Sequence, residues 1–236
     1  MSTIAENLAA VHARIETAAA RAGRSAADVQ LIAVSKTIPP ETMREVVAEG
    51  VTTFGESRVQ EAKAKIPQLP GSLQWHLIGH LQTNKAREAV ELFQMIHSVD
   101  SVRLARELDK CAEQSSLTVP VLLECNVSGE STKFGFKPDE AMAALTELNA
   151  LRRLEIRGLM TMAPFFEDPQ DARPTFRALR DLRDQLQQRH GIPLPALSMG
   201  MTNDFEAAIE EGATMVRVGT AIFRPEPPAK PAGAAR

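Results

Sequence analysis

Apolar and polar residues are grouped along this chain in a pattern that repeats almost from one end to the other. The first 22 residues place Ile4, Leu8 and Val11 three or four positions apart, and this spacing predicts one amphipathic helix that ends before Gly23. After that helix, an apolar run of about five to eight residues, a short polar loop and a helical pattern follow one another repeatedly. The repeating unit is therefore a strand followed by a helix.

The apolar runs predict eight strands. They comprise residues 29–36, 52–56, 73–80, 95–100, 119–128, 156–162, 196–200 and 215–223. Helical spacing is found between them in residues 40–50, 57–65, 84–91, 101–115, 138–150, 171–190 and 203–212. Strands that alternate with helices pair in parallel, and their lack of regular polar alternation indicates burial on both faces. The pattern therefore predicts an α/β fold, a (β/α)8 TIM-type barrel with an extra N-terminal helix.

The C-terminal residues 224–236 read RPEPPAKPAGAAR, and their prolines predict a flexible tail instead of a final helix. The barrel is therefore expected to be a single domain over residues 1–223 that lacks an eighth covering helix. We expect the N-terminal helix (residues 1–22) to fill this gap by packing between the last and first strands. An open doubly wound sheet is the alternative, but no glycine-rich dinucleotide fingerprint follows any predicted strand.

Composition and charge narrow the class of protein further. The 236 residues include 27 basic and 30 acidic side chains, and 44% of them are hydrophobic, which is typical of a globular chain and not of a disordered one. Because Lys and Arg form no cluster, we expect no nucleic-acid partner. No apolar stretch approaches the roughly 18 residues of a membrane span and no signal peptide is apparent, so we expect a cytoplasmic protein without membrane contact.

Candidate functional residues are sought at the carboxyl ends of the strands, because the active sites of such barrels lie there. The first predicted strand, LIAVSK, brings Lys36 to that face after an apolar approach. A lysine at a strand end can equally well extend into solvent without any function. The last two strands contribute glycines and hydroxyl groups at the same face, namely Ser198, Gly200, Thr202, Gly219 and Thr220.

These five residues have the chemistry of a phosphate site. Glycines let backbone N–H groups approach phosphate oxygens closely, hydroxyls add donors, and the helix expected near residue 203 directs its positive end toward them. Taken one at a time, they are also ordinary turn and helix-capping residues. Barrels often bind phosphate after the last two strands, so the two loops together favour a phosphate site.

Arg217 stands inside the apolar run MVRVG, which the barrel is expected to bury. A buried guanidinium needs an acceptor because burying an unpaired charge is costly. Two readings remain open from the pattern alone. Arg217 either faces a ligand in the barrel or forms a buried ion pair, with Glu56 or Glu124 as partner.

A lysine, a phosphate site and an arginine at one end of a barrel together suggest pyridoxal 5'-phosphate (PLP). A lysine amine can form a reversible Schiff base with the aldehyde of PLP, provided that it is desolvated enough to lose its proton. The phosphate site would hold the 5'-phosphate. An arginine against the ring nitrogen would keep that nitrogen unprotonated and weaken the ring as an electron sink.

Seven ordered sequence blocks carry a resemblance to a known family. They are AVSKT, FGESRVQE, WHLIGHLQTNK, NVSGESTKFGF, GLMTM, SMGMTND and VRVGTAIF. With these blocks the chain resembles the pyridoxal phosphate homeostasis proteins, single-domain fold type III PLP barrels similar to the N-terminal domain of alanine racemase. The resemblance implies that Lys36 forms the Schiff base and that Arg217 faces the pyridine nitrogen. It also implies a phosphate site formed by Ser198, Gly200, Thr202, Gly219 and Thr220.

The chain departs from the family pattern at a few positions. Ser57 stands where the second block commonly has Asn, so any contact of that amide near the cofactor is in question. Thr202 replaces a common Ser but keeps its hydroxyl group. Arg224 replaces the glycine that usually follows Ala-Ile-Phe, which concerns the end of the barrel and not its chemistry.

Three functions compete at this stage. The favoured one is a monomeric, non-catalytic protein that binds PLP reversibly through Lys36, maintains PLP homeostasis and passes PLP to PLP-dependent apo-enzymes. The second is a PLP-dependent amino-acid racemase, but racemisation uses two bases, and the tyrosine that supplies the second one in alanine racemases has no counterpart in a chain without tyrosine. The third is a barrel enzyme that acts on a phosphorylated metabolite without a cofactor.

Overall fold

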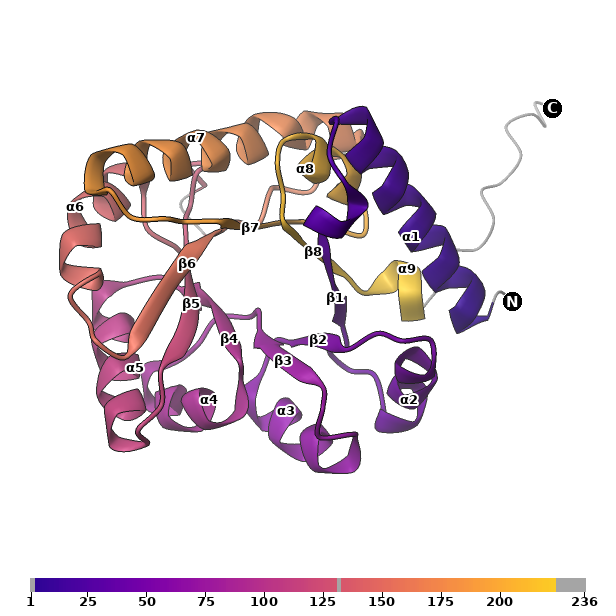
Figure 1. Cartoon of the computed structure of the whole chain (residues 1–236), viewed down its shortest axis with the longest axis horizontal. Coiled ribbons are helices and arrows are strands. Elements are labelled where there is room, and N and C mark those ends of the chain that lie inside the picture. Colours follow the sequence, from indigo (N-terminus) through magenta and orange to yellow (C-terminus); the bar gives the residue numbers. More distant parts are fainter. Residues whose placement is uncertain (1–2, 131–132, 224–236) are drawn as a thin grey trace.

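Eight parallel strands close into a barrel, and each strand pairs with its neighbours in chain order, as Figure 1 shows. The computed structural model describes residues 3–130 and 133–223. Its strands are β1 (Gln30–Val34), β2 (Thr53–Glu56), β3 (Gln74–Leu77), β4 (Met95–Val99), β5 (Val119–Glu124), β6 (Leu154–Met160), β7 (Ala196–Met201) and β8 (Met215–Val218). The last strand closes the barrel by pairing with the first. The predicted TIM-type barrel is confirmed.

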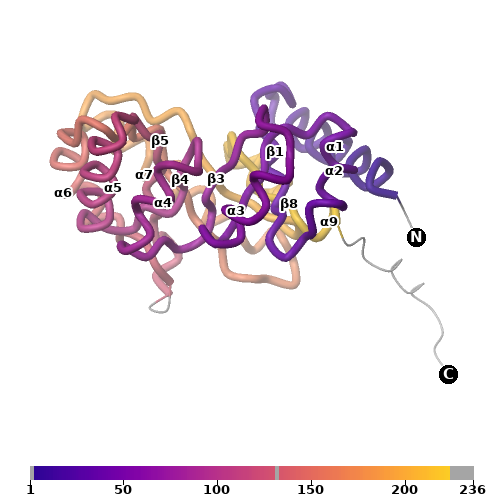
Figure 2. The backbone as a smooth tube through the Cα atoms, turned by 90° about the horizontal axis from the view of Figure 1, so that it is seen from below, coloured from indigo at the N-terminus to yellow at the C-terminus, as the bar shows by residue number. Residues whose placement is uncertain are grey.

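Helices surround this barrel, as Figure 2 shows from the side. In the described ranges they are α1 (Ile4–Arg21), α2 (Pro40–Ala48), α3 (Val59–Lys65), α4 (Ala86–Leu92), α5 (Val102–Gln114), α6 (Pro138–Leu148), α7 (Arg173–His190), α8 (Phe205–Glu210) and α9 (Thr220–Phe223). Short 3-10 helices lie at Ala26–Asp28, Ile66–Gln68, Thr83–Lys85 and Pro169–Ala172. None of the helices in the described part of the chain combines the length and the apolar character needed to cross a membrane.

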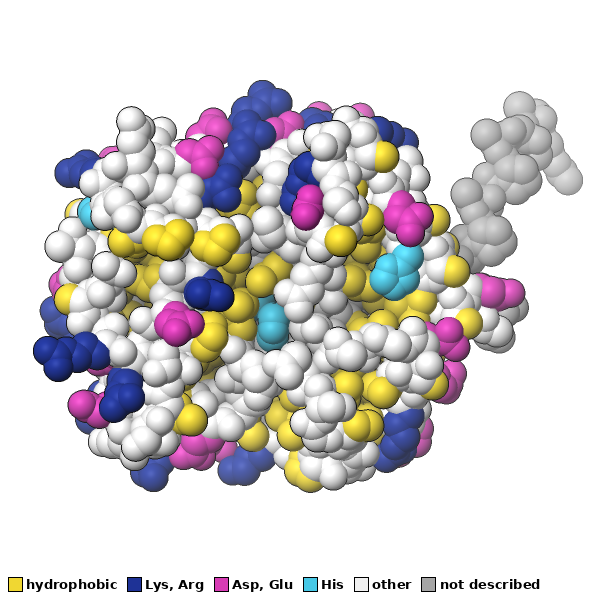
Figure 3. Space-filling model, viewed as in Figure 1, with side chains coloured by type: hydrophobic (Ala, Val, Ile, Leu, Met, Phe, Trp, Pro, Cys, Tyr) yellow, Lys and Arg dark blue, Asp and Glu magenta, His cyan; other side chains and the backbone are white. Residues whose placement is uncertain are grey.

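The hydrophobic core lies mainly between the strands and the helices, where large side chains such as Phe54 and Phe205 are completely buried. Burial of this apolar area is the main favourable term in folding. On the face seen in Figure 3, hydrophobic side chains gather around the centre of the barrel, and most charged side chains lie toward the periphery. Polar side chains that are buried inside the barrel are therefore exceptions that need partners.

The N-terminal helix α1 completes the outer ring of helices. Thr3 and Glu6 form a capping box at its start, and Leu8 and Val11 are buried on its inner face. The helix packs against α8 and α9 and also touches α2, and the Asn7 side chain donates a hydrogen bond to a carbonyl oxygen of α9 at 2.9 Å. It therefore covers the junction between the last and first strands, as the sequence analysis predicts.

The end of the barrel differs from the prediction. The last strand ends at Val218 and not at residue 223, because Gly219 turns the chain and its carbonyl oxygen accepts from the N–H groups of Ile222 and Phe223, at 2.9 and 3.0 Å. The expectation that no eighth helix follows the last strand is therefore wrong, since the single turn α9 stands there. The predicted flexible tail, residues 224–236, lies outside the described residues.

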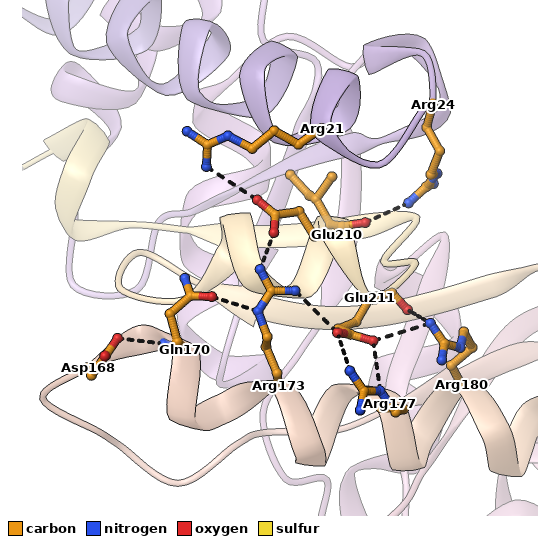
Figure 4. Close-up of polar contacts among 10 residues, drawn as sticks. Arg21, Arg24, Asp168, Gln170, Arg173, Arg177, Arg180, Glu210 and Glu211 are labelled. Carbon is orange, nitrogen blue, oxygen red and sulfur yellow. Dashed lines mark hydrogen bonds and ion pairs between the residues drawn. The ribbon is translucent and has the colours of Figure 1, made fainter.

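An ion cluster joins α7 to the end of α8, as Figure 4 shows. Three arginines of α7 donate to the carboxylate of Glu211: Arg173, Arg177 and Arg180, at 3.2, 3.1 and 3.2 Å. Arg173 also pairs with the neighbouring Glu210. Every one of these guanidinium groups has a carboxylate partner, so this side of the molecule is a compensated charge network.

Candidate functional site

A pocket of about 480 Å³ opens at the carboxyl ends of β1, β2, β3, β6, β7 and β8, a volume in the usual range of small-molecule sites. Five of the seven predicted site residues line it: Lys36, Thr202, Arg217, Gly219 and Thr220. Ser198 and Gly200 do not line it. The structure thus gathers the lysine, the arginine and most of the predicted phosphate-binding groups around one cavity.

Lys36 enters the pocket from a tight turn after β1. The N–H of Ile38 donates to the carbonyl oxygen of Ser35 at 2.9 Å and closes the turn, so Lys36 and Thr37 are its two central residues. Thr37 has a φ of 63°, a left-handed conformation that β-branched residues rarely adopt. The Lys36 side chain is exposed, so the desolvation that the sequence analysis expects around its amine is not present in this structure.

The hydroxyl groups of the pocket come from the ends of β7 and β8. Thr202 follows β7, and Thr220 follows Gly219 at the end of β8. A Cβ atom on Gly219 would lie 3.1 Å from the carbonyl oxygen of Val34, so the absence of a side chain lets β8 approach the end of β1 closely. This close approach sets Thr220 on the wall next to the strand that carries Lys36.

Gly200 has a packing role that the sequence analysis does not predict. Its φ is 90°, and an added Cβ would lie 2.6 Å from the Cβ of Ala208 and 2.8 Å from the Cα of Phe205. Both neighbours belong to α8. Gly200 therefore permits β7 to pack tightly against this helix, and it shapes the pocket only through the backbone that leads to Thr202.

Arg217 is 3% exposed and contacts the barrel through neutral oxygens. Its Nη1 donates to the Ser198 hydroxyl at 2.6 Å, and its Nη2 donates to the Thr161 carbonyl oxygen at 2.9 Å. Among the described residues no carboxylate lies within 4.0 Å of the guanidinium. The buried ion pair with Glu56 or Glu124, one of the two open readings, is therefore not formed.

The charge of Arg217 persists despite this burial. Desolvation lowers its pKa to about 10, and the more distant carboxylates Glu124 and Asp204 oppose that shift. At neutral pH the group is still protonated. A cation that lines a pocket and has no paired carboxylate is electrostatically suited to an acceptor atom of a ligand.

Ser198 lies behind Arg217 in a chain of buried polar groups. Its hydroxyl oxygen is 2.9 Å from Nδ1 of His97, and Nε2 of His97 is 3.0 Å from Nδ1 of His76. Burial lowers the pKa of His76 to about 4 and that of His97 well below its ordinary value, so both rings are neutral. With Arg217 donating to Ser198, each of the three contacts joins one donor to one acceptor when the hydroxyl donates to His97 and His97 donates to His76.

This chain joins strands that are not neighbours, since His97 belongs to β4 and Ser198 to β7. Such a contact runs through the interior of the barrel. His76 is a core residue, buried and in contact with His97, and the support that Ser198 and Thr161 give to Arg217 was not predicted. His97 within the apolar run MIHSV was the available signal, because a histidine there needs a polar partner.

The remaining walls bring together residues that sequence reasoning left unassigned. Met162 and Met201 are each 38% exposed and line the pocket with flexible apolar side chains. Ser57 also lines it. A Cβ on Gly79 would lie 2.4 Å from the Ser57 carbonyl oxygen, so the loops after β2 and β3 touch through their backbones at this departure from the family pattern.

Comparisons with known proteins agree with this geometry. A sequence model of the family described as "Alanine racemase, N-terminal domain" matches residues 7–227. The pyridoxal phosphate homeostasis protein of Aquifex aeolicus is 46% identical over 219 residues, which cover 92% of this chain and 96% of that protein. Its namesake from Pseudomonas aeruginosa is 44% identical over 226 residues, with coverages of 94% and 96%.

A solved structure of PipY from Synechococcus elongatus, with PLP bound, is 41% identical and superposes with a TM-score of 0.82, covering 94% of this chain and 100% of that one. Fold and site therefore define the class, a barrel of the alanine racemase N-terminal type. Within that class the chain belongs to the family of the pyridoxal phosphate homeostasis proteins. The resemblance drawn from the sequence blocks is confirmed.

Proposed function

We propose that this chain binds PLP reversibly through Lys36 and carries or buffers it, so that it maintains intracellular PLP homeostasis. One observation carries the proposal: Arg217, a buried cation without a paired carboxylate, lines the same pocket as the Lys36 amine. Two relatives in its family bear the name of this function, and a third was solved with PLP bound.

The residues of the pocket fit the three functional groups of PLP. Bound PLP would supply an aldehyde whose carbon forms a C=N bond with Nζ of Lys36, and the aldehyde oxygen would leave as water with the two amine hydrogens. Arg217 would donate a hydrogen bond to the pyridine nitrogen and leave it unprotonated, since a guanidinium with a pKa of about 10 does not release its proton at neutral pH.

The phosphate would lie among the hydroxyl and N–H groups at the ends of β7 and β8, the residues proposed being Ser198, Gly200, Thr202, Gly219 and Thr220. Thr202, Gly219 and Thr220 would contact the phosphate directly, since they line the pocket wall. Ser198 and Gly200 act from behind it, by holding Arg217 and by setting the course of the β7 backbone.

A non-catalytic role is proposed over a racemase. Among the described residues that line the pocket, Lys36 and Arg217 are the titratable ones, so a second base opposite the lysine is not supplied there. His76 is buried beneath Arg217 in the hydrogen-bonded chain and does not line the cavity. One base suits binding and release better than the two-sided proton transfer of racemisation.

The remaining parts of the proposal concern context. We propose a cytoplasmic monomer whose single barrel domain, residues 1–223, needs no partner to complete its pocket. PLP-dependent apo-enzymes would be the recipients of PLP, and no nucleic-acid partner is proposed.

The test adds PLP to the purified protein, reduces the Schiff base with borohydride and maps the labelled peptide by mass spectrometry. We expect the label on Lys36 and its loss in Lys36→Ala. Lys63→Ala is the matched control, because Lys63 is an exposed lysine that pairs with Glu88 away from the pocket. A label on another lysine in the wild-type protein contradicts the assignment, and racemisation of a single amino-acid enantiomer that depends on Lys36 favours the enzyme instead.

A further inference from the structure

A buried ionic cluster lies on the outer side of the barrel wall, directly behind Lys36. Lys65 of α3 is 7% exposed, and its Nζ donates to Glu56 Oε1 at 2.8 Å. Glu56 at the end of β2 is completely buried, and the same oxygen accepts from the Ser35 hydroxyl at 2.7 Å. The cluster thus links a helix, the end of β2 and the residue that precedes Lys36.

The same cluster forms hydrogen bonds with the backbone on both sides of Lys36. On the N-terminal side, Lys65 Nζ donates to the carbonyl oxygen of Ser35 at 2.7 Å. On the C-terminal side, Glu61 Oε1 accepts from the N–H of Thr37 at 2.5 Å, and that oxygen also accepts from Lys65 at 2.6 Å. Lys65 and Glu61 therefore hold the peptide groups before and after the residue that faces the pocket, and Glu56 holds Lys65 and the Ser35 side chain.

The conformation held in this way is one that the turn does not adopt easily by itself. A turn whose third residue has a positive φ is favoured by glycine or asparagine there, and this turn has Thr37 with a φ of 63°. Strained backbone persists only where its surroundings enforce it, and it concentrates at functional sites. The Glu61 carboxylate is the partner of the Thr37 amide in that strained conformation.

Electrostatics keep Glu61 ionised for this purpose. Its partial burial opposes ionisation, but the hydrogen bonds from Lys65 and from the Thr37 amide outweigh it and lower the pKa of Glu61. Glu56 is different, because burial raises its pKa more than Lys65 and Ser35 lower it. Oε2 of Glu56 is buried without a hydrogen-bond partner, so the ion pair with Lys65 is what offsets the energetic cost of burying this carboxylate.

We propose that Lys65, Glu56 and Glu61 are positioning residues that hold the strained Ser35–Ile38 turn and thereby keep the Lys36 amine directed into the pocket. The inference rests on the proposed function, since it gives these three residues a purpose in the reaction of Lys36 with an aldehyde. None of the three lines the pocket, so they act through the backbone of the turn.

A salt bridge on the same helix provides the contrast. Lys63 pairs with Glu88 at 2.9 Å on the surface and contacts nothing in the turn, although it lies only two residues from Lys65. A general contribution of α3 to stability would involve both lysines. Positioning of Lys36 involves Lys65 and its two carboxylate partners alone.

The experiment compares Glu61→Ala with Glu61→Gln and with the control Lys63→Ala. The rate of Schiff-base formation after mixing with PLP is followed by absorbance, deuterium exchange of the Thr37 amide by NMR, and stability by urea unfolding. Losing a hydrogen bond to a charged acceptor should slow the reaction of Glu61→Ala about tenfold and expose the Thr37 amide to exchange. Glu61→Gln keeps a carbonyl acceptor and should react within about twofold of the wild type, as should Lys63→Ala.

A second pair of variants separates positioning from stability. Glycine adopts a positive φ without strain, so Thr37→Gly added to Glu61→Ala should recover part of the lost rate. The double variant Lys65→Met with Glu56→Gln removes the fully buried carboxylate together with its lysine, and the charge left without Lys65 is that of the partly exposed Glu61, so the variant should fold and still react about tenfold more slowly.

The outcomes distinguish the two proposals. If wild-type protein forms no Schiff base at Lys36, the proposed function fails. If the wild type reacts and Glu61→Ala reacts at the same rate, the positioning role is overturned while the function stands. The positioning role is likewise overturned if adding Thr37→Gly to Glu61→Ala recovers none of the lost rate and Lys63→Ala reacts as slowly as Glu61→Ala.

Discussion

Arginines in two regions of this molecule meet opposite surroundings. On the outer face, Arg173, Arg177 and Arg180 of α7 all donate to the carboxylate of Glu211. Inside the barrel, Arg217 is more deeply buried than any of them, and its hydrogen-bond partners in the described part of the chain are neutral oxygens. Because an unpaired buried charge is costly, its persistence at a pocket indicates a ligand, whereas the outer arginines are explained by structure alone.

Two glutamates show the same contrast from the acidic side. Burial opposes the ionisation of Glu211, but hydrogen bonds from Arg177 and Arg173 outweigh it and lower its pKa. Burial raises the pKa of Glu124 to about 7, with Asp100 adding to the shift and the distant charge of Arg217 opposing it. The folded protein therefore favours the charged form of Glu211 and disfavours the charged form of Glu124.

The largest effect is expected from reversing the interior charge. Arg217→Glu removes the donors to Ser198 and Thr161 and adds a carboxylate to the surroundings of Glu124 and Asp204, the two acids that act on Arg217 at longer range. We expect the free energy of unfolding at neutral pH to fall by about 3–5 kcal/mol, the usual cost of an uncompensated buried charge. Urea unfolding followed by circular dichroism measures it.

Arg217→Gln is the matched variant, because its amide keeps one donor without the charge. It should be clearly more stable than Arg217→Glu and should still lose most of its PLP binding, measured by titration. Stability of the charge-reversed protein equal to that of the wild type would mean that the interior tolerates either sign, and the contrast with the outer face would disappear.

The second effect concerns Glu124 and depends on pH. Its pKa in the folded state, about 7, lies above the value of 4.5 expected when the chain is unfolded. Below pH 4.5 the group is protonated in both states and costs nothing; as pH rises toward 7 the unfolded state loses its proton first, so the folded state loses stability. Glu124→Gln should therefore gain about 2–3 kcal/mol over the wild type between pH 4.5 and pH 8.

Unfolding free energies of both proteins at a series of pH values provide the measurement. Glu130→Gln is a suitable control, since Glu130 is a surface partner of Lys133 and is 39% exposed. A difference between Glu124→Gln and the wild type that stays constant with pH would show that Glu124 has the same pKa in the folded and unfolded states, which contradicts the raised folded-state pKa.

Much of the barrel was predictable from the sequence because each strand and helix has its own apolar pattern. The errors fall where a single residue ends an element. The last strand ends early at Gly219, whose carbonyl oxygen accepts the hydrogen bonds of a helical turn. Because residues 221–223 in this turn are apolar, their sequence looks like a continuation of the strand. Apolar character alone does not distinguish a buried strand from a buried helical turn of the same length.

The site was predictable to the extent that strand ends are visible as a change from apolar to polar residues. That change placed Lys36, Thr202 and Thr220 correctly at the pocket. Ser198 does not line the pocket because it lies deeper in the barrel, where its buried hydroxyl meets Arg217 and His97.

Contacts between distant strands could not be predicted from the sequence, for a different reason. Arg217 was weighed against Glu56 and Glu124 as partners, yet Glu56 faces α3 on the outer side of the wall and Arg217 instead meets Ser198 and Thr161. Which of several buried polar groups come together depends on the closure of the barrel, and no local spacing records it.

The smallest effect belongs to the paired outer face. Glu211→Gln removes the negative charge but keeps a carbonyl acceptor for the α7 arginines, so we expect the free energy of unfolding at neutral pH to fall by about 1–2 kcal/mol. Because the folded-state pKa of Glu211 is depressed, this contribution is present above about pH 4.5 and is lost as pH falls through the folded value. PLP binding should not change.

The pH dependence of the two glutamate variants therefore has opposite sign. Relative to the wild type, Glu124→Gln becomes more favourable as pH rises, and Glu211→Gln becomes less unfavourable as pH falls, which parallel unfolding series resolve. Glu147→Gln is the control for Glu211, since Glu147 pairs with Arg106 in the open, where such pairs contribute about 0.5 kcal/mol or less. If Glu211→Gln lowers the free energy of unfolding no more than this control does, the outer cluster is a set of independent surface pairs. The contrast between the two regions would then depend on Arg217 alone.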